Sequence, residues 1–391
     1  MAKWLAKVSN ESKKFLEDIS VKNVNQNVEI MDFVLSRMNE NLLTFVDSFP
    51  TPQSNQYRYE KMPCTCWTSG FLVGMELLAY EYTEEKKFLD AANHHLEIFR
   101  HRIDNKIEVD HHDMGFLYSL AAVANYKITG NDYAKDTAIL AAEQLLTRYQ
   151  EKGGFLQAWG SMKSAGSYRL IIDCLMNIPL LFWATEVTGN PRYEEVAKRH
   201  LYTTVNVIIR ENATTHHTYF FDIKTGKPLY GRTSQGASDD SCWARGQAWG
   251  IYGMALAYSY TRDEVMLEHF KKLTDKFFEL LPEDLIPYWD MIYTDGSGEP
   301  RDTSAAAIAV CGILEMSRHK ECQDYVLKAQ KILNSLSEKY TSKHLVDSNV
   351  LLTDAMYNRP AGHKPEGAIF GDYFYMEALM RSLKPNWKPY W

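Results

Sequence analysis

The chain has 391 residues, of which 45% are hydrophobic and 24% charged, the composition of a globular protein. Its formal net charge of −7 and its scattered basic residues argue against nucleic acid as the main partner. No stretch reaches the roughly 18 apolar residues needed to cross a bilayer, so we expect no membrane partner. Residues 1–14 lack the apolar segment of a signal peptide, and the six cysteines are spread along the chain. This pattern fits reduced thiols in a cytoplasmic protein rather than a disulfide framework.

Helical hairpins follow one another along the chain. In each, a helix rich in small and aromatic residues ends at a turn, and a charged helix follows, as in residues 183–197 around Gly189 and Asn190. Gly and Asn at such a turn are typical end and start signals of helices. The first helix of each pair is apolar nearly all round, which predicts burial on both sides. The second has apolar residues at three- and four-residue spacing, which predicts one exposed face.

Twelve helices are expected in chain order, at 28–48, 67–82, 85–104, 114–128, 131–150, 168–187, 190–210, 243–260, 262–280, 303–317, 321–340 and 368–383. Six buried helices that alternate with six amphipathic ones predict an all-α fold, the closed (α/α)6 barrel. An open solenoid of the same hairpins is the alternative. No linker divides the chain, so we expect a single domain over residues 1–391, with residues 1–24 as an N-terminal extension.

The longest insertions all precede the inner helices, at 49–66, 151–167, 211–242, 281–302 and 341–367. Insertions on one face of a repeat structure usually build its binding face. Polar and aromatic residues are concentrated there, and the chain contains 24 Tyr and 9 Trp. Such rings suit stacking on sugars, although large helical proteins also bury aromatic residues in their cores.

Two aspartates stand out at these inner-helix starts. Asp113 opens a predicted helix, where the helix dipole favours the ionised carboxylate by ~0.3–1 kcal/mol. A simple N-cap is the plainer alternative for this residue. Asp173 lies in an otherwise nearly apolar segment, in which loss of hydration raises a carboxyl pKa. It is either part of a structural pair or a proton donor near neutral pH. Environments that separate two carboxyl pKa values in this way are typical of an acid and an ionised partner at one site.

Three further residue groups are candidates. The run His111-His112-Asp113 suggests a metal site, but adjacent residues at a helix start point in different directions and no second ligand cluster follows, so we expect no metal. Arg245 could clamp a carboxylate of a ligand, or form a buried ion pair with the acidic loop at 239–240. His217 could belong to the site or be an exposed loop residue.

Five motifs occur in a specific order, namely His-His-Asp-Met-Gly-Phe (111–116), Tyr-Arg-Leu-Ile-Ile-Asp (168–173), Thr-Ser-Gln-Gly (233–236), Trp-Ala-Arg-Gly-Gln-Ala-Trp (243–249) and Arg-Asp-Thr-Ser-Ala-Ala-Ala (301–307). Together they resemble the unsaturated glucuronyl hydrolases, glycoside hydrolase family 88, over about residues 25–385. The resemblance implies an (α/α)6-barrel enzyme without cofactor. Its substrate would be an unsaturated oligosaccharide left by a polysaccharide lyase, from whose non-reducing end it removes a 4,5-unsaturated uronic acid. The implied chemistry is hydration of the C4=C5 vinyl ether.

The resemblance also implies roles for individual residues. Asp173 matches the general acid/base, and Asp113 matches the residue that holds ring hydroxyls and stabilises developing positive charge. The matched substrate contacts are Trp67, His112, Trp159, His217, Gln235, Arg245 and Trp249.

One departure from the family pattern concerns sulfate. Members that prefer sulfated fragments carry an Arg before the Gln-Gly motif and a Ser/Lys motif in the last loop. Here the first position is Ser234 and the loop reads Gly-His-Lys-Pro-Glu-Gly (362–367). We therefore expect no preference for 6-sulfated substrates, unless Arg232 or Lys364 replaces that function.

Three other functions compete with this interpretation. An unsaturated rhamnogalacturonyl hydrolase acting on pectin fragments would share the barrel and the chemistry. A sugar 2-epimerase would use a similar barrel but needs a histidine as proton shuttle. A non-catalytic helical scaffold would show no convergence of polar residues at the starts of the inner helices.

Overall fold

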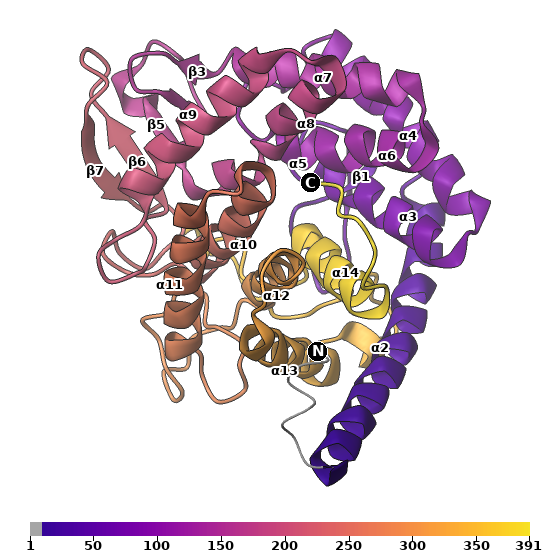
Figure 1. Cartoon of the computed structure of the whole chain (residues 1–391). Coiled ribbons are helices and arrows are strands. Elements are labelled where there is room, and N and C mark those ends of the chain that lie inside the picture. Colours follow the sequence, from indigo (N-terminus) through magenta and orange to yellow (C-terminus); the bar gives the residue numbers. More distant parts are fainter. Residues whose placement is uncertain (1–9) are drawn as a thin grey trace.

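The computed structural model describes residues 10–391, with side chains from residue 25 onward. Its helices form two concentric rings (Figure 1). The inner ring consists of α3 (Ser69–Thr83), the continuous run α5 (Met114–Tyr118), η1 (Ser119–Val123) and α6 (Ala124–Thr129), α8 (Pro179–Thr188), α10 (Ala244–Thr261), α12 (Thr303–Ser317) and α14 (Ile369–Leu383). The outer ring consists of α2 (Asn10–Thr44), α4 (Lys86–Asp104), α7 (Asp132–Leu146), α9 (Pro191–Ile208), α11 (Glu264–Leu280) and α13 (Gln323–Lys339). Because α14 packs against α3, the inner ring is closed, and the predicted (α/α)6 barrel is confirmed.

The two rings differ as their sequences predict. Inner helices pack so closely that some positions admit only glycine: a Cβ at Gly312 of α12 would lie 2.6 Å from the Cα of Tyr252 in α10. Outer helices bury one face, as α11 does with Phe270, Leu273 and Phe277. The hairpin turns also follow the expected chemistry, since the Asn190 side chain accepts a hydrogen bond from the Arg192 N–H at the start of α9.

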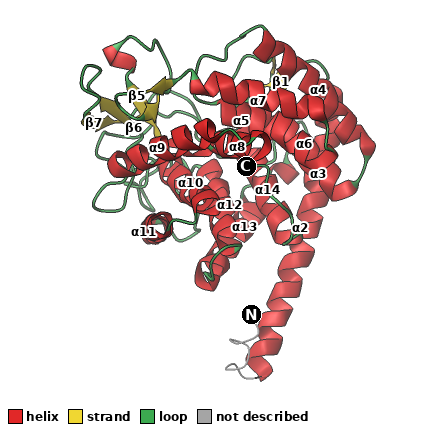
Figure 2. Cartoon of the chain, turned by 45° about the horizontal axis from the view of Figure 1, so that its top comes forward, coloured by secondary structure: helices red, strands yellow, loops and turns green. Residues whose placement is uncertain are grey.

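The helix predicted at 168–187 is wrong in its first half. Residues 169–171 form strand β5 (Arg169–Ile171), a 3₁₀ turn η3 (Ile172–Met176) follows, and the α-helix begins only at Pro179. Proline lacks a backbone N–H and suits the first turn of a helix, so it marks this later start. The strand exists because it pairs with β6 (Thr218–Phe221), which in turn pairs with β7 (Pro228–Arg232). Figure 2 shows this sheet at one edge of the barrel, next to α9.

Other short elements lie in the segments that precede the inner helices: β1 (Phe49–Pro50), β2 (Lys61–Met62), β3 (Tyr149–Gln150), β4 (Phe155–Leu156), η2 (Ala165–Ser167) and η4 (Ser342–His344). The helix expected at 131–150 ends earlier, at Leu146, because β3 pairs with β4. The first outer helix begins at Asn10 rather than at residue 28, so most of the expected N-terminal extension is helical, and residues 1–9 lie outside the described part. Within that described part, no helix is both long and apolar enough to cross a bilayer.

The C-terminal residues fill the interior of the barrel. The indole of Trp391 stacks on Phe374 of α14, with ring centroids 5.9 Å apart, and meets Phe116 of α5 edge-on at 6.0 Å. The ammonium of Lys127 at the end of α6 donates to the backbone carbonyls of residues 389–391. The barrel therefore has a packed core, and one set of its buried polar residues lies at the end where the inner helices start.

Candidate active site

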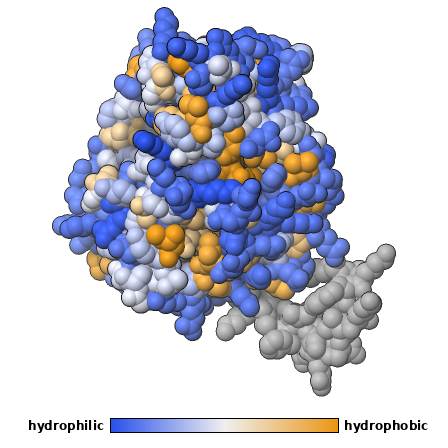
Figure 3. Space-filling model, turned by 90° about the vertical axis from the view of Figure 1, so that its left-hand side faces the viewer, coloured by the Kyte–Doolittle hydropathy of each residue, from blue (hydrophilic) through white to orange (hydrophobic). Residues whose placement is uncertain are grey.

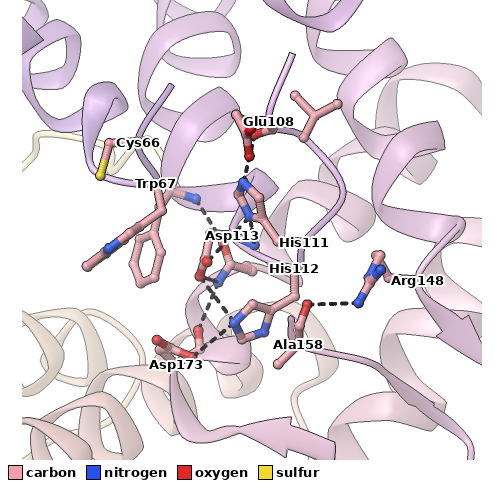
Figure 4. A network of polar contacts seen from close by, with 12 residues as sticks. Cys66, Trp67, Glu108, His111, His112, Asp113, Arg148, Ala158 and Asp173 are labelled. Carbon is pink, nitrogen blue, oxygen red and sulfur yellow. Dashed lines mark hydrogen bonds and ion pairs between the residues drawn. The ribbon is translucent and has the colours of Figure 1, made fainter. Parts of the chain in front are cut away.

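Three features of the chain meet at the inner-helix starts: the residue before α5, the 3₁₀ turn η3 and the first turn of α10. Asp113 is the residue that precedes α5, Asp173 lies in the first turn of η3, and Arg245 lies in the first turn of α10. Figure 4 shows the first two pointing toward each other with His112 between them. This convergence of polar groups is what a non-catalytic scaffold would lack.

The imidazole of His112 lies between the two carboxyl groups. Its Nε2 is 3.2 Å from Oδ1 of Asp113 and 3.5 Å from Oδ1 of Asp173. Burial lowers the pKa of His112 to about 4, so the ring is neutral at pH 7. The amide of Asn177 links the same two residues, because it donates to the backbone carbonyl of Asp173 at 3.1 Å and lies 3.5 Å from the Asp113 carboxylate.

Asp173 has the properties of a proton donor. Its Oδ1 is buried and has no hydrogen-bond partner, and it forms no ion pair with Lys or Arg among the described residues. Burial raises the pKa of Asp173 well above its ordinary value, the charge of Asp113 adds to the rise, and Arg245 opposes it. The structural-pair alternative therefore finds no Lys or Arg partner among the described residues, and the raised pKa favours the protonated form of the carboxyl group.

Asp113 has the opposite character. Burial opposes its ionisation, but His112, His111 and a hydrogen bond from the Trp159 side chain outweigh burial, so the pKa of Asp113 is lowered. Its side chain makes no capping bond to α5, which excludes the simple N-cap interpretation. The backbone N–H of Asp113 donates to Nδ1 of His111, whose Nε2 donates to the Glu108 carbonyl. The site thus combines one carboxyl group whose pKa is raised with one whose pKa is lowered.

Arg245 is held inside the protein rather than aimed at open space. One of its terminal nitrogens donates to Asp302 at 2.6 Å and to the Met356 carbonyl at 2.8 Å, and the other donates to Gln235 and the Tyr357 carbonyl, both at 2.6 Å. The suggested partner at 239–240 is wrong, because the buried ion pair is formed with Asp302. Arg245 therefore fixes Gln235 and the loop that precedes α14.

His217 is buried, with 5% of its surface exposed, so the exposed-loop alternative is wrong. Its Nδ1 accepts a hydrogen bond from the Ser234 N–H at 3.1 Å and lies 3.2 Å from the Thr233 hydroxyl. Burial lowers the pKa of His217 to about 3, so its remaining proton sits on Nε2 at neutral pH.

The three candidate tryptophans differ in how much surface they offer. Trp159 is 37% exposed and stacks on His111 with centroids 4.2 Å apart, so its outer edge and face are accessible. Trp67 is half-buried against Phe370. Trp249 is 1% exposed beneath Phe116, which leaves it little surface for a ligand. Stacking on a sugar stays a prediction for all three, with Trp159 the most available.

Sequence reasoning missed Arg148, Asn177 and Asp302 as parts of this site. The guanidinium of Arg148 is fully buried and donates to the carbonyls of residues 157, 158 and 160, which holds the Trp159 loop in place. Asn177 and Asp302 lie in segments that carry a sequence motif, and this was the only indication of their role in the sequence. Their partners Asp113 and Arg245 are 64 and 57 residues away, so the sequence could not predict which residues they contact.

His112, Asp113 and Asp173 could together hold a metal ion. Ligand atoms of His112, Asp113 and Asp173 lie within 4.8 Å of one another, in the only such group found among the described residues. The expectation of no metal assumed that no further ligand joins His112 and Asp113, and this premise is wrong because Asp173 does. The metal-free expectation itself stays a prediction, which chelation tests.

Comparisons of the sequence and of the structure with known proteins agree with one another. A model of Glycosyl Hydrolase Family 88 matches residues 36–384. The chain is 46% identical over 371 residues to the unsaturated chondroitin disaccharide hydrolase of Streptococcus agalactiae serotype III (strain NEM316), covering 93% of this chain and 92% of the other. It is 37% identical over 358 residues to the unsaturated glucuronyl hydrolase of Bacillus sp. (strain GL1), covering 90% and 95%. The crystal structure of unsaturated glucuronyl hydrolase from Streptococcus agalactiae superposes with a TM-score of 0.92 at 45% identity, covering 94% of both chains.

Proposed function

The chain belongs to glycosyl hydrolase family 88, and we propose from this that it releases 4,5-unsaturated glucuronic acid from the non-reducing end of glycosaminoglycan oligosaccharides. The relatives support this substrate class, since a mutant of the Streptococcus agalactiae enzyme has been crystallised with dGlcA-GalNAc6S. They are named for glucuronyl or chondroitin disaccharide substrates, which favours this activity over the hydrolysis of pectin fragments.

The reaction begins with proton transfer from Asp173 to C4 of the unsaturated ring. The positive charge that develops at C5 and the ring oxygen is stabilised by the ionised Asp113, whose Oδ1 lies 3.2 Å from Nε2 of the neutral His112. Water then adds at C5 and gives its proton to the Asp173 carboxylate, which regenerates the acid. The hemiketal that results opens and expels the rest of the sugar chain, so the C4=C5 bond is lost as the glycosidic link breaks.

Arg245 acts in this proposal through Gln235. An arginine has five N–H donors, and its two terminal nitrogens already make the four hydrogen bonds described above. A direct clamp on the substrate carboxylate would have to displace them. Gln235 and His217, each fixed by a neighbour, are better placed to contact the unsaturated ring, while Trp159 stacks on the sugar that follows it.

The observation that carries the proposal is a half-buried Asp173 carboxyl group, whose buried Oδ1 has no hydrogen-bond partner, beside an ionised Asp113. The test is to mix the protein with unsaturated chondroitin and hyaluronan disaccharides and to follow the ultraviolet absorbance of the alkene. We expect the absorbance to fall because hydration removes the C4=C5 bond. If neither disaccharide reacts while an unsaturated rhamnogalacturonyl disaccharide does, the pectin alternative is correct. If a sugar isomerises with its alkene absorbance unchanged, the epimerase alternative is correct.

A further inference from the structure

The sheet β5–β6–β7 adjoins the active site. Asp173 follows the end of β5 by two residues, His217 immediately precedes β6, and Thr233 immediately follows β7. The strands are antiparallel in register, with Ile171 opposite Thr218, so one end of every strand meets the catalytic residues. A ligand that occupies the site can therefore extend onto the outer part of the sheet.

One face of this sheet carries rings and guanidinium groups. Arg169, Phe220 and Tyr230 are paired across the three strands, and Arg232 lies in the neighbouring row. Side chains alternate along a strand, so these residues share a face, while the buried Leu170 marks the opposite face toward the core. Tyr230 is 47% exposed and the Arg232 side chain 63%. Figure 3 views the molecule from the side on which this sheet lies.

These four side chains form a continuous stack, which we call the Arg–aromatic ladder (Arg169, Phe220, Tyr230 and Arg232). The Phe220 and Tyr230 rings are 5.3 Å apart and inclined by 25°. The Arg169 guanidinium lies 5.6 Å from the Phe220 ring, and that of Arg232 lies 5.4 Å from the Tyr230 ring. Cross-strand ring pairs and cation–π contacts stabilise sheets by themselves, so the stack alone does not imply a ligand.

The charge of the Arg–aromatic ladder indicates that it attracts anions, in addition to stabilising the sheet. The guanidinium of Arg169 forms no ion pair among the described residues and donates one hydrogen bond, to the Gly166 carbonyl. The nearest carboxylate to Arg232 is that of Asp239, at 4.0 Å. On a chain of net charge −7, two weakly neutralised guanidinium groups on one face form a local anion-attracting surface. Guanidinium groups bind carboxylates and sulfates bidentately, and exposed rings offer flat amphipathic surfaces.

We infer that the Arg–aromatic ladder binds the reducing-side sugars of anionic oligosaccharides longer than a disaccharide while their unsaturated end occupies the site. This inference rests on the proposed function. The accessible ring of Trp159 provides the connection, because the neighbouring Ala158 N–H donates to the Arg169 carbonyl at 3.0 Å. A chain leaving Asp173 past Trp159 thus meets strand β5 and then the ladder. In an oligosaccharide with alternating uronic acids, the third sugar again carries a carboxylate for Arg169 or Arg232.

A protein partner fits this surface less well. Two rings of at most ~250 Å² each contribute far less than a specific protein interface buries, which is about 1,200–2,000 Å² in total. A narrow row of two rings between two cations matches the width of a single sugar chain instead.

The test compares unsaturated chondroitin disaccharide and tetrasaccharide as substrates of Tyr230→Ala and Arg232→Ala. We expect kcat/KM for the tetrasaccharide to fall about three- to tenfold, the value of one lost ring or charge contact. The value for the unsulfated disaccharide should stay unchanged, because the Tyr230 ring contacts Phe220, and the Arg232 guanidinium contacts Tyr230 and Asp239 rather than Asp173. Leu229→Ala and Arg192→Ala are the matched controls: both residues are exposed, and neither belongs to the ladder. Added salt should weaken tetrasaccharide use by the wild type more than by Arg232→Ala.

Equal ratios of tetrasaccharide to disaccharide kcat/KM in wild type, variants and controls would overturn the inference. Failure of the proposed function is seen separately, as no reaction of the wild type with the disaccharide. In that case, calorimetric titration still measures whether the Arg–aromatic ladder binds the tetrasaccharide. In an Asp173→Asn background, Tyr230→Ala and Arg232→Ala should each weaken tetrasaccharide binding severalfold. Unchanged binding in both variants would exclude the ladder as a ligand site.

Discussion

Replacing Arg245 with alanine should cost fold stability and activity together. The Arg245 and Asp302 side chains are 3% and 0% exposed, and their charged atoms are 2.6 Å apart. Removal of the guanidinium leaves the Asp302 carboxylate buried without its cation, and breaking a buried pair in this way costs ~3–5 kcal/mol. It also frees Gln235 and the carbonyls of residues 356 and 357 from their donor.

The expected change in melting temperature follows from the size of the chain. Unfolding entropy is about 2.1 cal/mol/K per residue, so the 391 residues give roughly 0.8 kcal/mol/K. A loss of ~3–5 kcal/mol therefore lowers the melting temperature by about 4–6 °C. Because Gln235 loses its anchor, kcat/KM should fall more than stability alone explains. Arg245→Lys keeps the charge but not the fork of donors, so it should lie between wild type and alanine.

A double-mutant cycle separates the ion pair from general damage. Melting and denaturant unfolding are measured for Arg245→Ala, for Asp302→Ala and for the double variant. If the pair is as described, the double variant loses less than the sum of the singles, by ~1.5 kcal/mol or more, because no unpaired charge remains. Losses that add to within ~0.5 kcal/mol would show that the two residues act independently and would refute this reasoning.

Three other predictions concern metal, sulfate and the second carboxylate. EDTA should leave activity unchanged, and a loss that a divalent cation restores would instead assign His112, Asp113 and Asp173 to a metal site. Unsulfated chondroitin disaccharide should react at least as well as the 6-sulfated one, since Ser234 offers no guanidinium; a strong preference for the sulfated substrate would implicate Arg232 or Lys364. Asp113→Asn should cut kcat severely with little change in KM or melting temperature, because it removes the negative charge but not the volume, whereas near-wild-type kcat would exclude charge stabilisation by Asp113.

The barrel was predictable because each hairpin carries its own local signals. A buried helix followed by an amphipathic one, with Gly189 and Asn190 at the turn, determines the same unit wherever it occurs. The position of Asp113 before its helix was predictable for the same reason. These features depend on residues a few positions apart, and propensity and periodicity describe such short distances well.

The local structure around Asp173 was not predictable in this way. Its apolar neighbours suit a buried helix or a buried strand equally, and pairing with β6, whose residues are 47 to 51 positions away, decides for the strand. The partner of Arg245 is a second example. Acidic residues at 239–240 are near in sequence, but barrel closure brings Asp302 to the guanidinium. Non-local packing thus determined the electrostatics of the site, while the residue types that compose it were visible in the sequence.

The central claim is that Asp173 gives the proton that starts the reaction. Activity should therefore be lost on the alkaline side as pH rises through the raised pKa of Asp173. Because this pKa is raised above its unfolded value, the stability that the protonated carboxyl contributes is also lost as pH rises through it. Asp173→Asn, which has no proton to lose, should then be at least as stable as wild type at alkaline pH.

The most direct measurement is kcat of Asp173→Asn on an unsaturated chondroitin disaccharide, alongside ligand binding and melting temperature. General acid–base catalysis contributes about 10²–10⁴-fold, so kcat should fall at least 10²-fold while the disaccharide still binds and the fold is retained. If the variant kept more than about a tenth of wild-type kcat, a loss smaller than that range, Asp173 would not be the proton donor and its carboxyl group would have a structural role only.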